Sequence, residues 1–169
     1  VMGPRSRDLL ARLTEADLSA GGFPYLTSRE VWLASARVRA SRVTYVGELG
    51  WELHVPADLA LTVYDALLEA GPAFGFRNVG LGAMGSLRLE KAYRDFGLDI
   101  DNTDTPFDVG LGFAVAMDKP GGFIGRDALE RQRAEGLRKR MVQFAVDDRD
   151  VVLLHNEPDP DAMASGLAL

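Results

Sequence analysis

The stretch from Tyr45 to Leu53 has the residue types needed to hold a small molecule. It contains two carboxylates, two glycines and a tyrosine, namely Tyr45, Gly47, Glu48, Gly50 and Glu52. A carboxylate offers two hydrogen-bond acceptors and no donor. It therefore suits a ligand edge that presents two adjacent N–H groups, as a pterin, a purine or a guanidine does. The first hypothesis is a small-molecule site in which Glu52 binds such an edge.

The period of a β-strand leaves a second interpretation of Glu52 open. Glu52 and His54 would share one face of a strand, and Trp51, Leu53 and Val55 the other. If the apolar face packs into the core, Glu52 is simply exposed to solvent.

The other residues of the stretch have alternatives of the same kind. Tyr45 could line a pocket with its ring or pack as an ordinary hairpin residue. Glu48 is predicted to be a turn carboxylate that faces water. Gly47 and Gly50 are predicted to be turn glycines, which adopt positive φ or allow a close backbone approach.

Composition excludes several classes of function. The 169 residues include 47% apolar residues, which predicts a folded core, and the net charge of −6 argues against a general polyanion binder. Cysteine is absent, and the two histidines lie about a hundred residues apart. We therefore predict no disulfide, no metal site and no serine triad. With no apolar run long enough for a membrane span and no signal-peptide pattern, we predict a cytoplasmic protein.

Two further segments resemble ligand sites in composition only. Residues 99–104 are acidic like a calcium loop, but they lack its sixth-position glycine and its closing glutamate, so we predict a plain loop. Residues 80–85 are rich in glycine ahead of a helix, but no phosphate-binding Lys-Ser/Thr pair follows. Close helix packing explains those glycines better than a phosphate site does.

The elements that would position these residues follow from periodicity and turn signals. The predicted helices are 3–13, from 56–58 to 70, 80–91 and 127–134, with an ion pair between Lys91 and Asp95 at the end of the third. The predicted strands lie in 29–45 and at 51–55, 112–117 and 137–146, with a polar loop at 95–106. Residues from 157 onward show no periodicity. Hairpin strands with helices after them indicate an α+β fold with an antiparallel sheet.

Three motifs in this order resemble the tetrahydrofolate-dependent aminomethyltransferase family, named after the T-protein of the glycine cleavage system. They are Tyr45-x-Gly47-Glu48-x-Gly50-x-Glu52, Gly80-Leu81-Gly82-Ala83-x-x-Ser86-Leu87-Arg88-Leu89-Glu90 and Phe123-Ile124-Gly125-Arg126-Asp127-Ala128-Leu129. Residues 88–97 are most similar to the C-terminal region of dimethylglycine and sarcosine dehydrogenases. T-proteins proper carry an Arg-Asp pair where this chain has Met84-Gly85, which favours the dehydrogenase-type relatives.

The resemblance implies a function and a binding site. Tyr45 and Glu52 fall on the family's pterin-contacting tyrosine and glutamate, so tetrahydrofolate is the implied cofactor, with FAD possible in an upstream domain. The family's catalytic aspartate lies upstream of the matched segment, so no residue here is assigned as catalytic.

The implied organisation is a partial folate-binding domain at 1–136, without its N-terminal part. The first strand of a truncated C-terminal β-barrel domain would follow at 137–169. The implied activity is one-carbon transfer from a small amine-derived donor in an N-methylamine demethylating system, with a flavin domain as partner. The alternative is a non-catalytic module that binds folate or docks onto a flavoprotein; relatives that assist iron–sulfur assembly depend on a cysteine, which is absent here.

Overall fold

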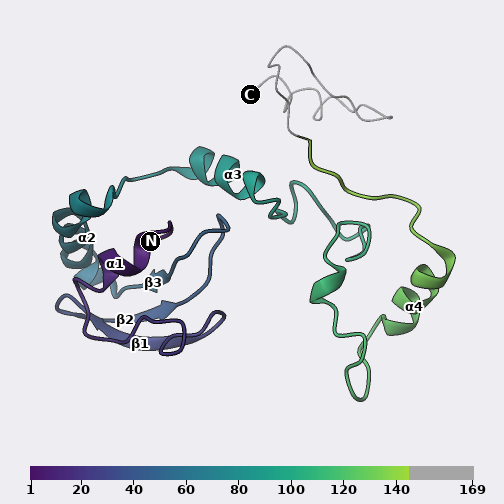
Figure 1. Ribbon diagram of the computed structural model, residues 1–169, viewed down its shortest axis with the longest axis horizontal. Coiled ribbons are helices and arrows are strands. Elements are labelled where there is room, and N and C mark those ends of the chain that lie inside the picture. Colours follow the sequence, from purple (N-terminus) through teal and green to yellow (C-terminus); the bar gives the residue numbers. More distant parts are fainter. Residues whose placement is uncertain (145–169) are drawn as a thin grey trace, which may run out of the picture. The chain divides into compact units, whose positions relative to one another are not determined.

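The computed structural model describes residues 1–144, which form two units, one from Val1 to Asp99 and one that begins at Ile100. The first unit contains one sheet and most of the helices (Figure 1). Its elements are α1 (Ser6–Leu10), β1 (Ser28–Leu33), β2 (Ala36–Ser41), β3 (Glu52–His54), the 3-10 helix η1 (Ala57–Leu59), α2 (Ala60–Ala70), the 3-10 helix η2 (Gly71–Phe74) and α3 (Leu81–Glu90). The second unit has the 3-10 helix η3 (Gly112–Ala114) and α4 (Arg126–Glu135).

The sheet is antiparallel and has the order β1-β2-β3. β1 and β2 form a hairpin around Ala34 and Ser35, and Ala34 takes a positive φ of 50° there. β3 pairs with β2 so that Glu52 lies opposite Ser41. This arrangement, with helices packed beside an antiparallel sheet, confirms the predicted α+β class.

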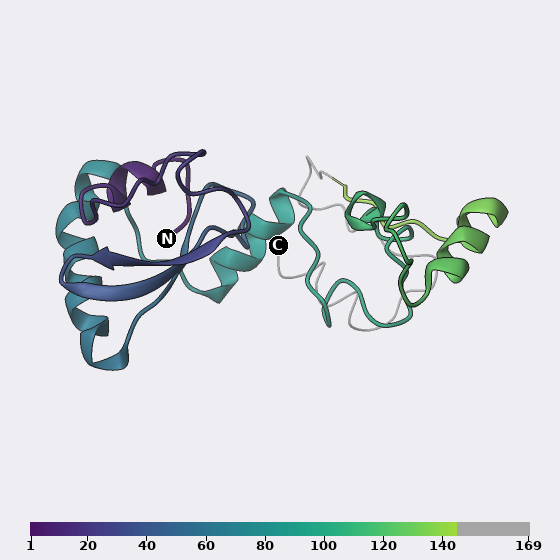
Figure 2. The same ribbon diagram turned by 90° about the horizontal axis from the view of Figure 1, so that it is seen from below.

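The core of the first unit lies between one face of the sheet and the helices α1 and α2 (Figure 2). Alternation along β2 buries Ala36, Val38 and Ala40 and exposes the two arginines between them, as the period of a strand requires. Trp51 and Phe23 are fully buried and meet edge to face with ring centroids 6.1 Å apart. Burying two such rings supplies a large share of the apolar area that stabilises a sheet this small.

The helices α2 and α3 differ in detail from the predicted ones. α2 ends at Ala70, but Gly71 and Pro72 continue the chain as η2, and the left-handed residue that ends the run is Gly75 with φ 72°. α3 matches its predicted bounds, yet its apolar residues Ala83, Met84 and Leu87 are not buried. The side chain that α3 buries is Arg88 instead.

The second unit forms no strand in its described part, residues 100–144. The predicted strand 112–117 is wrong, because Gly112–Ala114 form the 3-10 helix η3. Residues 137–144 also form no strand, and the last two residues of the predicted strand 137–146 lie outside the described residues, as does the stretch from 157 onward. In the part of the chain that the structure describes, no helix is long and apolar enough to cross a membrane.

Candidate functional site

The loop between β2 and β3 carries Tyr45 and is held at both ends. Gly47 has φ 72°, and a Cβ atom there would lie 2.5 Å from the side chain of Lys91. Gly50 is crossed by the chain at Met2, where a Cβ atom would lie 2.9 Å from the carbonyl oxygen of Val1. Both glycines therefore serve the predicted purposes, the first as a left-handed turn residue beside a side chain and the second through close backbone approach.

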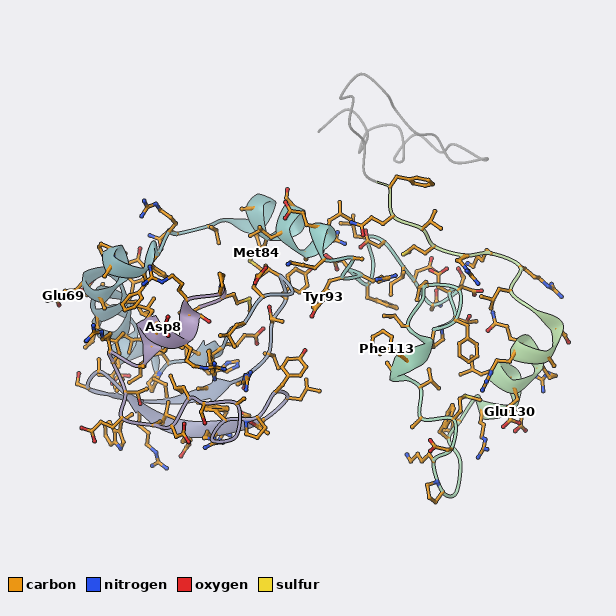
Figure 3. The ribbon with its side chains drawn as sticks, in the orientation of Figure 1. Asp8, Glu69, Met84, Tyr93, Phe113 and Glu130 are labelled. Carbon is orange, nitrogen blue, oxygen red and sulfur yellow. The ribbon has the colours of Figure 1, made fainter. Side chains whose placement is uncertain are left out.

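Tyr45 lies half-buried in this loop, and its hydroxyl donates a hydrogen bond to Asp95 Oδ2 at 2.6 Å. That bond, formed with the neutral phenol, raises the pKa of Tyr45. Asp95 lies after the end of α3, fifty residues along the chain. The loop and the end of α3 are thus one structural site (Figure 3, where Met84 and Tyr93 mark this part of the chain).

Asp95 is itself part of a network that begins at the buried Arg88. Its backbone N–H donates to Asp99 Oδ2 at 2.9 Å, and the Arg88 guanidinium donates to both oxygens of Asp99. The same guanidinium donates to the carbonyl of Tyr93 at 3.0 Å. The hydrogen bond to Asp99 raises the pKa of Arg88 further, so the cation is permanent.

Sequence reasoning missed Arg88 as a site residue. An arginine on a helix with exposed neighbours is normally solvated, and its partner, Asp99, lies eleven residues away in a segment predicted to be a polar loop. One signal in the sequence could have pointed to Arg88. Several aspartates follow the helix, and a buried arginine needs a carboxylate as its partner.

The contacts of Glu48 and Lys91 differ from those predicted for them. The Glu48 carboxylate does not simply face water, because it forms an ion pair with Lys91 at 2.8 Å. Lys91 was predicted to pair with Asp95, but α3 ends at Glu90, so helical spacing no longer applies beyond it. The bond to Glu48 raises the pKa of Lys91. This pair and the Tyr45–Asp95 bond fix the loop to the end of α3 at two points.

Glu52 lies on the exposed face of the sheet, at the start of β3. Trp51 before it is fully buried, and Leu53 after it is half-buried, so the strand alternates as predicted. Within residues 1–144, the Glu52 carboxylate forms no hydrogen bond or ion pair, and it makes none with Tyr45 in particular. Its two oxygens are therefore available to a ligand with adjacent N–H donors.

Glu52 and Tyr45 each offer hydrogen-bond acceptors to a ligand. Glu52 supplies a free pair of acceptors on a rigid strand, because Trp51 anchors the residue before it in the core. Tyr45 supplies a ring and a hydroxyl oxygen from a loop that is held in place. A carboxylate of this kind accepts from two adjacent N–H groups of a ligand in a bidentate, charge-assisted pair.

A cavity of about 410 Å³ lies in the second unit, away from the predicted site residues in the sequence. It is lined by charged side chains of both signs, among them Asp108, Arg131 and Lys139, and by the neutral Gln132. The acidic residues 99–104 do not form a calcium loop, since Asp101 accepts from Thr103 and Asp104 pairs with Lys139. Within residues 1–144, no group of three or more metal-ligating side chains is placed to hold an ion.

The glycines at the start of α3 and within it do not support close packing. A Cβ atom at Gly80, Gly82 or Gly85 would have no neighbour within 4 Å. The prediction that these glycines permit close helix packing is therefore wrong for the described residues. Most of the helix is exposed, with Leu81 at 83% and Leu89 at 43% exposure, and Arg88 is the residue that it buries.

Comparison with known proteins matches residues 1–119 to the model of the GCVT N-terminal domain. The chain is 44% identical to human mitochondrial sarcosine dehydrogenase over 88% of its length, and 41% identical to human mitochondrial dimethylglycine dehydrogenase over 89%. It is 45% identical over 93% of its length to the formaldehyde-forming 4-methylaminobutanoate oxidase of Paenarthrobacter nicotinovorans. These matches cover only 16%, 18% and 19% of the respective relatives, so the chain spans less than a fifth of each.

The family match covers more than half of the chain, and it includes the segments that hold Tyr45, Glu52 and the network around Arg88. The relatives are of the dehydrogenase type that residues 88–97 resemble. The chain therefore belongs to the GCVT N-terminal domain family, the aminomethyltransferase family that its motifs resemble.

Proposed function

We propose that this chain is the tetrahydrofolate-binding segment of a one-carbon transferase in an N-methylamine demethylating system of the dimethylglycine or sarcosine type. One observation carries the proposal: Tyr45 and Glu52 lie on a fixed loop and the adjacent strand, inside the segment that matches the family. Relatives at 41–45% identity are named for the oxidation of sarcosine, dimethylglycine and 4-methylaminobutanoate.

In this proposal Glu52 grips the N–H edge of the pterin, and Tyr45 contacts the ring from the side of the loop. Tetrahydrofolate, when bound, accepts the one-carbon unit at its N5. The contribution of the chain is to orient the pterin, since positioning of two reactants removes much of the entropic barrier to transfer. The catalytic aspartate and a flavin domain would come from polypeptide outside this chain. The cytoplasmic location stays a prediction, and both human relatives are named as mitochondrial.

The test is calorimetric titration of the chain with tetrahydrofolate under anaerobic conditions. Glu52→Gln removes the charge and one of the two acceptors, so we expect the affinity to fall by about 10- to 100-fold. Glu69→Gln is the matched control, because Glu69 is an exposed carboxylate on α2 (Figure 3) that makes the same change in charge. Its affinity should stay at the wild-type value.

Equal binding by both variants would remove Glu52 from the site. No binding by the wild-type chain would contradict the proposal for the isolated segment. Thermal unfolding of both variants shows whether the fold is intact. Because Glu52 is exposed and its attraction to the Val1 ammonium is not a hydrogen-bonded pair, neither substitution should lower Tm by more than about 1–2 °C.

Exposed leucines on α3 favour a second candidate, a module that docks onto a flavoprotein. Leu81 and Leu89 lie two turns apart on the same side of the helix, and both are exposed. Exposed leucines on one side of a helix are a mark of a protein–protein contact. Under this function Leu81→Ser and Leu89→Ser weaken association with a purified sarcosine dehydrogenase-type flavin domain and leave folate affinity unchanged, which calorimetry with each partner separates.

A further inference from the structure

The outer edge of the segment 49–51, just before β3, is paired with the first residues of the chain. These residues run antiparallel to it, with Met2 opposite Gly50. The N–H of Trp51 donates to the carbonyl of Val1 at 2.9 Å, and the Val1 ammonium donates to the carbonyl of Trp51 at 2.8 Å. Two bonds exchanged by one pair of residues are the pattern of an antiparallel ladder.

The same edge is open one step further along, at β3 itself. The main-chain groups of successive strand residues point to opposite sides, so those of Leu53 point to the same side as those of Trp51. The groups of Glu52 face β2, where Glu52 lies opposite Ser41. In the described part of the chain, the main chain of Leu53 forms no hydrogen bond outside the sheet. Leu53 therefore offers one donor and one acceptor to a strand that would continue this ladder.

The amino group of Val1 stands where a ladder has a backbone N–H. Its burial lowers its pKa, because the charged form loses hydration, and the Glu52 carboxylate acts on it in the opposite direction. A peptide N–H makes the same bond to Trp51 without the cost of burying a charge. The position directly before Val1 therefore suits a further residue in extended conformation, and it lies on the side of Glu52.

We propose that an extended polypeptide preceding Val1 adds to the outer edge of β3 as a fourth, antiparallel strand of the sheet. In the register set by Met2 and Gly50, the residue directly before Val1 lies opposite Glu52, and the second residue before Val1 lies opposite Leu53. In the relatives compared above, most of the polypeptide lies outside the matched segment. The open edge thus continues a pairing that the chain already forms.

The added strand places a side chain beside Glu52. Directly opposite residues of an antiparallel pair share a face of the sheet, with Cβ atoms about 4.5–5.5 Å apart. A cationic side chain directly before Val1 would pair with the Glu52 carboxylate and compete with a ligand, whereas a small one would leave both oxygens free. The residue directly before Val1 therefore determines what Glu52 can bind. This consequence rests on the proposed function, while the strand addition itself does not.

The test of the strand uses the chain with Thr-Val-Thr added before Val1, released from a fusion protein so that nothing precedes these three residues. Nuclear magnetic resonance should show a contact between the α-hydrogens of Glu52 and of the residue directly before Val1, since such a pair has the shorter Cα spacing of the ladder. Exchange of the Leu53 N–H should be slower by about tenfold or more than without the addition. The matched control is Thr-Pro-Thr, in which proline opposite Leu53 blocks the ladder and should remove both effects.

A second pair of additions tests the effect on the Glu52 site. Thr-Val-Lys puts a lysine directly before Val1, on the face of Glu52, and Thr-Lys-Val puts it on the other face of the added strand. The two chains have the same composition and net charge. Calorimetric titration with tetrahydrofolate should give a severalfold weaker affinity for Thr-Val-Lys, because the lysine pairs with the carboxylate. Circular dichroism shows that each chain is folded.

The outcomes separate the strand from the proposed function. No α-hydrogen contact and unchanged exchange at Leu53 overturn the inference, and so do equal effects with Thr-Pro-Thr. Both readouts are made without folate, so a chain that forms the strand and binds no tetrahydrofolate contradicts the proposed function alone. Equal affinities of the two lysine-bearing chains would overturn the role of the added strand at Glu52.

Discussion

The two units of this chain are organised by different interactions. In the first unit a sheet and two helices enclose an apolar core around Trp51 and Phe23. In the described part of the second unit the buried polar centre is Asp108, which accepts from Thr105 and Gln132, while its carbonyl accepts from Met141. Val109 is the one fully buried apolar residue among residues 100–144.

This difference indicates that the first unit, which has an apolar core, is the one that can keep the residues of a binding site in place. Apolar burial is the main favourable term in folding, and a site needs elements that stay in place. The Tyr45 loop and β3 are attached to the core of the first unit. In the second unit large apolar side chains such as Phe113 and Ile124 are exposed, at 87% and 105% (Figure 3 shows Phe113).

The largest expected effect is the loss of the central ring of the first unit. Trp51→Ala should lower the free energy of unfolding by about 3–5 kcal/mol, because it leaves a cavity in a core that has few other large side chains. Trp32→Ala is the control, since Trp32 is 64% exposed on β1 and should cost less than about 0.5 kcal/mol. Urea denaturation followed by far-UV circular dichroism measures both, and similar losses would contradict the described core.

The next effect concerns the buried cation of the first unit. Arg88→Met should destabilise it by about 3 kcal/mol, because Asp99 keeps its charge without its partner. Arg12→Met, at an exposed position, should change the free energy of unfolding by less than about 0.5 kcal/mol. The same denaturation experiment applies, and a loss no larger than that of the control would show that Arg88 is solvated.

A smaller effect is expected in the second unit, where a hydrogen-bonded carboxylate takes the place of a core. Asp108→Ala leaves donors of Thr105 and Gln132 unpaired and should cost about 1–3 kcal/mol. Hydrogen exchange should then be faster in residues 100–144 and unchanged in the sheet. Asp118→Ala, at an exposed position, should have no such effect; a change that spread to the sheet would contradict the division of the chain into two units.

The smallest effect belongs to the surface pair Lys139–Asp104. The hydrogen bond from Lys139 lowers the pKa of Asp104 below its usual value of 3.8. The pair therefore contributes to the free energy of unfolding above pH 3.8, and this contribution is lost as the pH falls through the lowered pKa. Lys139→Met should shift Tm by less than about 2 °C at neutral pH and raise the pKa of Asp104 in a carboxyl NMR titration. Lys119→Met is the control, and an unchanged titration of Asp104 in Lys139→Met would show that the pair does not form in solution.

Several elements were predictable because they depend on local rules. The sheet strands, α3 and α4 follow from short-range periodicity. Gly47 follows from the positive φ that glycine permits, and Gly50 from the close backbone approach that the lack of a side chain allows. The strand predicted at 112–117 failed because a short apolar run has no decisive period. Whether it becomes a strand depends on a partner strand, and residues 100–144 provide none.

The sequence by itself determined the α+β class, the family, and the candidate residues Tyr45 and Glu52, because motifs and alternation are local patterns. Only the tertiary structure showed that Tyr45 gives its proton to Asp95 and that Arg88 is buried beneath that segment. These contacts join residues up to fifty positions apart, and the direction of a hydrogen bond depends on which acceptor the fold brings within reach. The choice between donor and acceptor at Tyr45 is therefore a property of the folded chain.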